Sequence, residues 1–289
     1  MNGASRLVLL CLLIVSGCGV SQEAPDQKLT GPYLGQMPPG ATPIAFAPEI
    51  VSTQGWEVSG VFTPDLLNFY YIRRNKQSQK QEIVEFKNIN GYWHERVFSA
   101  RNGTPLFSPS GDIMYLGKRF RKRTDSGWSE LQPLGGALES WPIMRLSASA
   151  NGTVFFDEFK QDLTGDIRFA RLVDGQYQAP QLLNKLINTG RSFHPFIAPD
   201  ESYLIFDSKR ENGFGDSDLY ISYKQKEGTW GAPINLGEKI NTNAWEALAS
   251  VTPDGKYLFF NRQMSQGGYG DVDIFWVSAD IIEQLKPAS

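Results

Sequence analysis

The sequence predicts an all-β protein, a β-propeller of five four-stranded antiparallel blades closed by an N-terminal strand. Three observations lead to this prediction. A strand, a turn rich in Pro, Ser, Asn, Asp and Gly, and a strongly apolar strand recur at residues 62–71, 107–116, 149–156, 198–206 and 252–260. A third strand opens after glycine and aspartate in three of these units. In four places a glycine followed closely by an aromatic residue marks the start of a fourth strand.

The spacing of the turns indicates the length of each blade. The turns are anchored on Pro64, Pro109, Ala150, Pro199 and Pro253, which lie 45, 41, 49 and 54 residues apart. A period of this length, built of short strands, is typical of a propeller blade. Asp and Asn hold such turns through bonds to their own backbone, and Gly supplies positive φ. The second strands are continuously apolar, which predicts burial on both faces between stacked blades.

The two ends of the repeat region predict how the ring closes. The fifth unit stops after its third strand, at residues 274–277, and an unassigned strand-like stretch, residues 44–51, precedes the first unit. That stretch is similar to the fourth-strand segment at residues 230–236. We therefore expect the N-terminal strand to complete the last blade, which removes exposed sheet edges. A sixth blade would need roughly 45 further residues.

These strand and turn residues resemble the TolB-like, or PD40, group of WD40-like propeller repeats found in bacterial envelope proteins. The resemblance is densest over residues 191–285, in the runs 194–206, 230–237 and 252–260, and extends more weakly back to residue 57. The shared residues belong to turns and packing positions. The resemblance therefore implies the propeller fold and a binding or scaffold role, and it supplies no catalytic residue.

The N-terminus resembles a bacterial lipoprotein signal peptide over residues 1–17. Arg6 precedes an apolar run, residues 7–15, that is too short to span a bilayer as a mature helix. The sequence Val-Ser-Gly-Cys follows, and the resemblance implies that Cys18 is acylated and becomes the new N-terminus. Several acyl chains give stable anchoring. The alternative is an ordinary signal peptide with an incidental cysteine. Gly19, rather than Asp, favours the outer membrane, with the protein facing the periplasm.

The rest of the chain divides into a tether and one domain. Residues 18–43 are rich in Ser, Gln, Pro and Gly and predict a flexible tether. Residues 44–289 are expected to form the propeller and a short C-terminal helix, in which Asp280 and Glu283 have capping-box spacing. Hydrophobic residues make up 41% of the chain and aromatic residues 12%, which suffices for one large all-β domain. We expect a monomer.

Composition argues against several functions. The formal net charge is −3, and loss of Arg6 with the signal peptide makes the protein more acidic, which argues against binding nucleic acid. Cys11 lies in the signal peptide and Cys18 is the lipid site, so no thiol remains for a disulfide, a metal or a nucleophile. The two histidines, His94 and His194, are too few for a zinc site. We expect no metal and no cofactor.

The candidate binding site is the mouth of the central channel, where the first strands of the blades begin. This face lies opposite the Pro-Asp-Gly turns. Carboxylates, indoles, an arginine and a histidine around one opening suit an envelope polysaccharide or protein. The alternative is that the tryptophans pack between blades and the glutamates cap loops. The candidates are Glu57, Glu139, Trp141, Arg191, His194, Trp245 and Glu246.

A basic strip on the first two blades is a second candidate surface. It combines the third-strand region of blade two with the corresponding region of blade one. Phosphate-bearing envelope polymers or an acidic partner would suit its charge, and a solvated strand without a partner is the alternative. The residues are Arg73, Arg74, Lys118, Arg119, Arg121 and Arg123.

Two function classes remain open. The first, which we favour, is a lipid-anchored propeller that binds a protein or glycan without chemistry of its own. The second is a glycan-cleaving enzyme, because five-bladed propellers also house glycosidases; it needs two carboxyls roughly 5–9.5 Å apart in a pocket. A nucleophile elbow of the Gly-x-Ser-x-Gly type is absent from the sequence. The carboxylates near the axis are Glu57, Glu139, Asp157, Glu158, Asp207 and Glu246.

Overall fold

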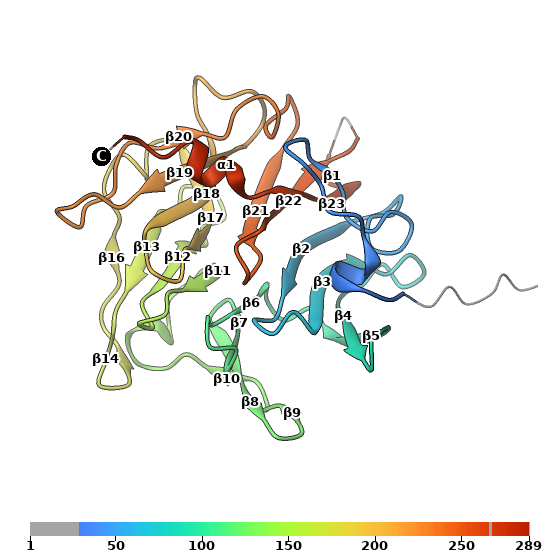
Figure 1. The fold of residues 1–289 in the computed structure, drawn as a ribbon. Coiled ribbons are helices and arrows are strands. Elements are labelled where there is room, and N and C mark those ends of the chain that lie inside the picture. The colour runs from blue at the N-terminus through green and yellow to red at the C-terminus, as the bar shows by residue number, and fades with distance from the viewer. Residues whose placement is uncertain (1–28, 266–267, 289) are drawn as a thin grey trace, which may run out of the picture.

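The computed structural model describes residues 29–265 and 268–288 and shows five antiparallel sheets arranged around a central axis (Figure 1). This confirms the predicted five-bladed propeller. Blade 1 consists of β2 (Glu57–Phe62), β3 (Asn68–Arg74), β4 (Gln81–Ile89) and β5 (Tyr92–Ala100). Blade 2 consists of β6 (Pro105–Phe107), β7 (Ile113–Leu116), β8 (Arg119–Thr124) and β10 (Gln132–Pro133), with β9 (Gly127–Trp128) also paired to β8.

Blades 3 and 4 follow the same order. Blade 3 consists of β11 (Ile143–Ala148), β12 (Val154–Glu158), β13 (Ile167–Ala170) and β16 (Gln181–Leu182). A small hairpin of β14 (Leu172–Val173) and β15 (Gln176–Tyr177) projects between its last two strands. Blade 4 consists of β17 (Arg191–Ile197), β18 (Tyr203–Lys209), β19 (Asp218–Tyr223) and β20 (Ile234–Asn235). The one-turn helix η2 (Gly136–Leu138) lies between blades 2 and 3 in the sequence.

Blade 5 joins the two ends of the propeller. It consists of β21 (Glu246–Val251), β22 (Tyr257–Gln263), β23 (Val272–Ser278) and the N-terminal β1 (Ile44–Ala45). Ile44 pairs with Trp276 and Ala45 with Phe275, in antiparallel register. The prediction that an N-terminal strand completes the last blade is therefore confirmed, and β1 covers the outer edge of β23 (Figure 1).

Aromatic packing holds the closing junction between blades 5 and 1. Phe46, which follows β1, lies 4.9 Å from Phe69 of blade 1 and 4.8 Å from Phe259 of blade 5, measured between ring centroids. Trp276 adds an edge-to-face contact with Phe46 at 5.1 Å. All four side chains are buried. Such pairs contribute about 0.5–1.5 kcal/mol each beyond the burial of their area, so the short β1 is fixed by side chains more than by its two-residue ladder.

The segment before β1 differs from the expected flexible tether. Residues 29–43 pack on the propeller, where η1 (Pro32–Gly35) buries Tyr33 and Leu34 in the core between blades 5 and 1. The Tyr33 hydroxyl donates to Asp254 at 2.5 Å, and the Trp93 indole donates to the carbonyl of Gly31 at 2.8 Å. The composition of this segment predicted flexibility, but two apolar side chains and two bonds suffice to hold it. The rest of the predicted tether, and the signal peptide, lie outside the described residues.

The chain ends in α1 (Asp280–Gln284), whose Ile282 is buried against blade 5. The capping-box expectation was wrong, because Asp280 is the first helical residue and Ala279 is the cap. The Oγ of Ser278 accepts the backbone N–H of Asp280 at 3.2 Å instead. Within the described residues, the model contains no helix with the length and apolar character that a bilayer span requires.

Candidate functional site

A cavity of about 370 Å³ opens where the first strands of the blades begin. Its lining residues come from all five blades and from the loops that lead into their first strands. The turns that follow the first strands lie at the other end of these strands, so the cavity is the mouth of the central channel. We call it the mouth cavity.

The cavity floor is formed at equivalent positions of the first strands, five residues before the turn anchors. Ser59, Thr104, His194 and Leu248 all line the cavity at this position. The fifth equivalent residue, Arg145, points into the channel instead. It is fully buried and donates to the carbonyl oxygens of His194 at 3.1 Å and Ala249 at 2.8 Å. The channel beneath the mouth cavity is therefore crossed by an arginine that bridges three blades.

A β-bulge positions three of these floor residues. Ser59, His194 and Leu248 have φ of 63°, 50° and 60°, in the left-handed region that side chains other than glycine rarely adopt. Each lies where the register of its first strand shifts against the second strand. A bulge turns the residue out of the ladder and leaves its backbone N–H without a strand partner.

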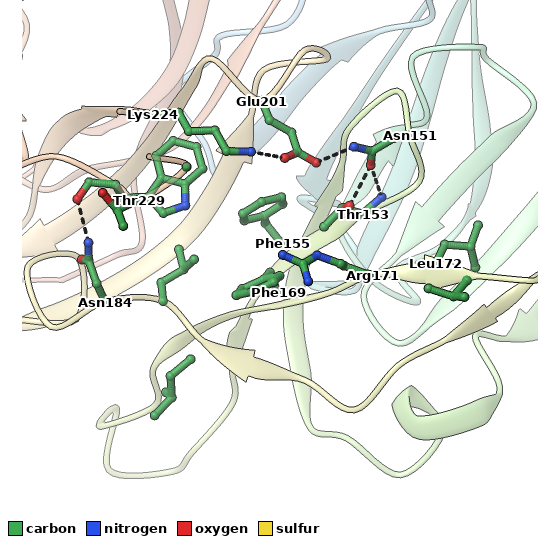
Figure 2. A pocket seen from close by; sticks show the side chains of 15 residues that line it. Asn151, Thr153, Phe155, Phe169, Arg171, Leu172, Asn184, Glu201, Lys224 and Thr229 are labelled. Atoms are coloured by element: carbon green, nitrogen blue, oxygen red, sulfur yellow. Dashed lines mark hydrogen bonds and ion pairs between the residues drawn. The ribbon is translucent and has the colours of Figure 1, made fainter. Parts of the chain in front are cut away.

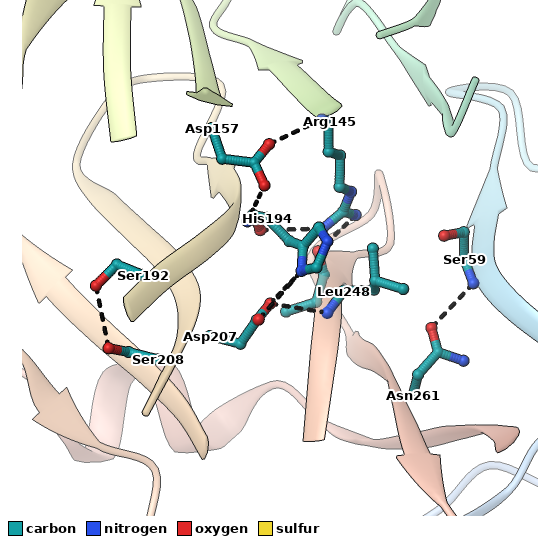
Figure 3. Close-up of polar contacts among 10 residues, drawn as sticks. Ser59, Arg145, Asp157, Ser192, His194, Asp207, Ser208, Leu248 and Asn261 are labelled. Carbon is teal, nitrogen blue, oxygen red and sulfur yellow. Dashed lines mark hydrogen bonds and ion pairs between the residues drawn. The ribbon is translucent and has the colours of Figure 1, made fainter. Parts of the chain in front are cut away.

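A polar side chain from the preceding blade satisfies each of these N–H groups (Figure 3). Asp157 of blade 3 accepts from His194 N at 3.1 Å, and Asp207 of blade 4 accepts from Leu248 N at 3.1 Å. In the same way Asn261 of blade 5 accepts from Ser59 N at 2.9 Å. These three residues occupy one position in their second strands, immediately after the apolar run. They clamp neighbouring blades together and stabilise the strained bulges.

Asp157 and Asp207 share a buried ionic cluster with Arg145 and His194. Asp157 also accepts from the backbone N–H of Arg145 at 2.8 Å, and Asp207 lies 3.0 Å from Nδ1 of His194 (Figure 3). Two carboxylates, a guanidinium and an imidazole balance in charge when the imidazole is protonated. This balance explains how four ionisable groups lie together in the interior.

The pKa values of this cluster follow from burial and from the neighbouring charges. Burial lowers the pKa of Arg145 to about 10, against the opposing effect of Asp207 and Asp157. Burial raises the pKa of Asp157, although His194 acts in the other direction. Burial by itself would lower the pKa of His194, but the charge and hydrogen bond of Asp207 outweigh it and raise that pKa. The folded protein therefore favours the imidazolium form of His194 more than the unfolded chain does.

A repeated sequence, Thr-x-x-Trp-Glu, builds the wall of the mouth cavity at residues 53–57 and 242–246. In both copies the tryptophan, Trp56 or Trp245, lines the cavity. The glutamate turns away and is buried. Glu57 accepts from the Thr53 hydroxyl at 2.8 Å, and Glu246 accepts from the equivalent threonine hydroxyl at 2.6 Å. The glutamate therefore closes the loop that presents the indole.

The lining of the mouth cavity is aromatic and basic. Trp245 packs edge-to-face on Tyr269, with ring centroids 5.4 Å apart. Arg101 lies over the ring of Trp56, at 5.7 Å from its centroid. The cations are Arg101, Arg191 and Lys209, and Asp216 is the one carboxylate among the described lining residues. Asp216 lies 3.1 Å from Lys209, so the cavity retains excess positive charge.

Two hydroxyl groups in the cavity have no hydrogen-bond partner within the described protein. These are the Oγ atoms of Ser59 and Ser217, both buried side chains. Buried polar atoms are nearly always hydrogen-bonded in folded proteins. Both oxygens are themselves shielded from solvent, so they lie behind the exposed lining of the cavity and offer it no free hydrogen-bonding group.

The seven residues predicted for the channel mouth fall into four groups. Arg191, His194 and Trp245 line the cavity, whereas Glu57 and Glu246 are buried behind it as loop clamps. Glu139 is exposed beyond η2 and does not line the cavity. Trp141 packs in the core of blade 3, with Arg168 over its ring at 5.1 Å. Trp245 likewise packs against a buried core cluster, and it differs from Trp141 in that it also lines the cavity.

Sequence reasoning missed Trp56 and Arg101, although the repeat contained the necessary signal. Counting eight residues back from each turn anchor gives Trp56, Arg101, Pro142, Arg191 and Trp245. Four of these five line the cavity. Trp141 lies one position away from this equivalence, which is why it does not reach the mouth.

The basic strip is largely engaged within the protein. Arg73 pairs with Glu82 at 2.8 Å and Glu95 at 2.5 Å, and so carries no free charge for a partner. Arg74 lies over Trp56. On blade 2, Arg119 and Arg121 donate to the backbone carbonyls of Asn102 and Ser129, and Arg123 covers Trp128. Lys118 is exposed.

The carboxylates considered for glycan cleavage do not converge in the mouth cavity. None of the six lines it. Asp157 and Asp207 lie within strands rather than in turns, and their oxygens accept bonds from the protein. Glu158 pairs with Arg168 at 3.3 Å.

Among the described residues, clusters of three or more side chains suited to a metal ion are not found. Cys18 lies outside the described residues.

Comparison with known proteins gives similarity of fold. No family model matches the sequence, and no curated protein matches it. TolB from Acinetobacter baumannii aligns with a TM-score of 0.46 and 13% identity over 77% of this chain and 57% of the other; the chain thus spans little more than half of that protein. A putative TolB from Agrobacterium tumefaciens aligns with a TM-score of 0.48 and 14% identity, over 79% of both chains. An endo-arabinase from Bacteroides thetaiotaomicron aligns with a TM-score of 0.48 and 15% identity, over 78% of this chain and 94% of the other.

Proposed function

We propose that this protein is a binding module that holds an acidic glycan in the mouth cavity. The observation that supports this proposal is the lining, in which two indoles on adjacent blades stand beside three cations. Aromatic faces suit the apolar faces of sugar rings. Guanidinium groups bind carboxylate or phosphate substituents in paired geometry.

A glycan is favoured over a peptide because of how the strands are arranged at the mouth. Extended peptides are commonly bound by adding a strand to a free sheet edge. The first strands, which surround the cavity, are edge strands that pair only with the second strands of their blades. At the mouth, however, they present their ends and bulged residues to the ligand. Side chains, rather than a backbone edge, thus make the recognition surface.

Binding is favoured over cleavage by the state of the carboxylates. A glycosidase of the expected kind needs one carboxyl group to donate a proton and a second to act as a base or nucleophile. Glu57, Glu246, Asp157 and Asp207 all accept hydrogen bonds that hold loops or blades in place. Using one of them in chemistry would cost that structural bond.

The proposal includes anchoring of the protein by lipid on Cys18, in the outer membrane and facing the periplasm. Its support is the signal-like sequence of residues 1–18. The bond from Tyr33 to Asp254 holds the N-terminal segment at the turn end of blade 5, remote from Trp245 at the start of β21. An anchor on this segment would leave the mouth cavity pointing away from the membrane, open to a ligand.

Calorimetric titration tests the glycan proposal. The probes are trigalacturonate, neutral maltotriose of equal length, and a hexaglutamate peptide, each at low and physiological salt. We expect trigalacturonate to bind more tightly than the other two, with affinity falling as salt rises. Trp245→Ala and Arg191→Gln should each weaken it by about tenfold, as for a lost aromatic or charge-assisted contact.

Two exposed control substitutions, Phe159→Ala and Lys118→Gln, lie outside the mouth cavity and should leave binding unchanged. Tighter binding of the hexaglutamate peptide than of trigalacturonate would indicate that the ligand is a protein and not a glycan. Binding that neither mouth substitution weakens would place the ligand elsewhere and reject the proposal.

A further inference from the structure

A second cavity, of about 550 Å³, lies between blades 3 and 4, at the end of the strands opposite to the mouth. Figure 2 shows the side chains that line it. It shares no lining residue with the mouth cavity. Asn151 and Glu201, from the turns that follow the first strands of these blades, form one side of it. We call it the interblade cavity. Nothing in the proposed glycan function uses it.

The base of the interblade cavity is an aromatic surface. Phe155 and Phe169 stack with centroids 5.9 Å apart and an interplanar angle of 25°. Trp230 of blade 4 stands perpendicular to Phe155, at 6.0 Å. Phe155 and Trp230 are buried, so core packing fixes their positions. These three rings form a rigid surface against which a planar group can stack.

The rim of the interblade cavity exposes apolar side chains to solvent. Leu172, Val173 and Leu182 are 39%, 46% and 53% exposed, and all three line the cavity. They come from the β14–β15 hairpin and from β16. Exposed apolar residues gathered around one hollow are typical of a binding site rather than of ordinary surface.

The charges at the interblade cavity are unequal. Glu201 is satisfied by Lys224 at 2.5 Å, Asn151 at 2.9 Å and Ser149 at 2.9 Å, so this pair is neutral (Figure 2). The guanidinium of Arg171 lies over Phe169 at 5.5 Å, and no described carboxylate or carbonyl pairs with it. A single uncompensated cation therefore stands beside the aromatic surface.

We infer that the interblade cavity binds an aromatic carboxylate, with the ring on Phe155, Phe169 and Trp230 and the carboxylate on Arg171. The guanidinium group of an arginine donates two parallel hydrogen bonds to a carboxylate. The rim side chains cover the far side of the ring. The carboxylate belongs either to a free small molecule or to the C-terminal aromatic residue of a peptide, because both present the same chemistry.

Titration of four probes into the full chain tests this inference, with binding measured by calorimetry and by the indole N–H signals in NMR spectra. The probes are 2-naphthoate, its neutral amide 2-naphthamide, and the peptides acetyl-Gly-Phe with a free or an amidated C-terminus. We expect both carboxylates to bind more tightly than their amides and to shift the Trp230 signal, assigned with Trp230→Phe. The two carboxylates also separate the sources, since the tighter one identifies a small molecule or a chain end.

Two exposed positions provide substitutions that leave the core intact. Arg171→Gln should weaken the binding of 2-naphthoate by about tenfold, as for loss of a charge-assisted pair. The affinity for 2-naphthamide should stay unchanged. Leu182→Glu should weaken it through like-charge repulsion. Lys185→Gln removes a nearby exposed cation that does not line the cavity and should have no effect.

Equal binding of acid and amide, or 2-naphthoate affinity unaffected by Arg171→Gln, would overturn the inference. So would a shift confined to the indoles of Trp56 and Trp245. Trp245→Ala separates the two sites, because it should weaken trigalacturonate binding by about tenfold without changing 2-naphthoate binding.

Discussion

His194 Nδ1 lies 3.0 Å from Oδ1 of Asp207, inside the channel and directly beneath the mouth cavity. The same oxygen of Asp207 accepts the backbone N–H of Leu248 from the next blade. One carboxylate thus orients a cavity side chain and joins two blades. The mouth cavity and the junction between blades 4 and 5 therefore depend on the same buried group.

Asp157→Ala should destabilise the protein by about 3–5 kcal/mol, as for one member of a buried charge cluster. The substitution leaves the N–H groups of Arg145 and His194 without an acceptor and the Arg145 charge less compensated. Urea unfolding followed by circular dichroism measures the effect. Asp125→Ala, at an exposed turn, should change stability by less than about 0.5 kcal/mol. Similar losses in the two variants would contradict the proposed role of Asp157.

Stability should fall as pH rises above about 6.5, the ordinary pKa of histidine. The pKa of His194 is higher in the folded protein than in the unfolded chain. Protonated His194 therefore contributes its full stabilisation at pH values below the pKa of the unfolded chain, and this contribution is lost as the pH rises through the pKa of the folded protein. Unfolding free energies measured between pH 5 and pH 9 should show this decline in the wild type and a smaller one in His194→Gln. Parallel curves for the two proteins would show that His194 does not contribute.

Leu34→Ala should cost about 2–5 kcal/mol, because a fully buried leucine leaves a cavity. Alanine at φ 58° also retains the left-handed strain without the packing. Met37→Ala is the matched control, since Met37 is 85% exposed three residues away. Thermal unfolding measures both variants. If Leu34→Ala unfolds like the wild type, the N-terminal segment does not pack on the propeller as described.

Glu246→Gln should lower stability by about 1–3 kcal/mol without changing glycan affinity. Glu246 accepts from Thr242 and pairs with Arg262 at 2.8 Å, away from the cavity. Thermal unfolding and trigalacturonate titration on one preparation separate the two effects. A fall in affinity comparable to that of Trp245→Ala, at unchanged stability, would make Glu246 a ligand contact.

Much of the propeller was predictable because its signals are local. The turns at Pro64 and Pro253 are fixed by nearby side chains: Asp65 Oδ1 accepts from the Thr63 hydroxyl, and Asp254 Oδ1 accepts from Thr252 in the same way. A residue two positions away decides such a turn, so its type and spacing can be read in the chain. The equivalence of Trp56 and Trp245 could also be read from the repeat.

The sequence by itself determined the five blades, the first two strands of each and the strand that closes the ring, since these depend on apolar runs and turns within one repeat. Only the tertiary structure decided which polar residues face the mouth and which are buried. Asp157 and Asp207 follow their apolar runs just as turn residues would. They become clamps because ring closure brings bulged N–H groups of the next blade within hydrogen-bonding distance, and burial there requires a partner for each of them.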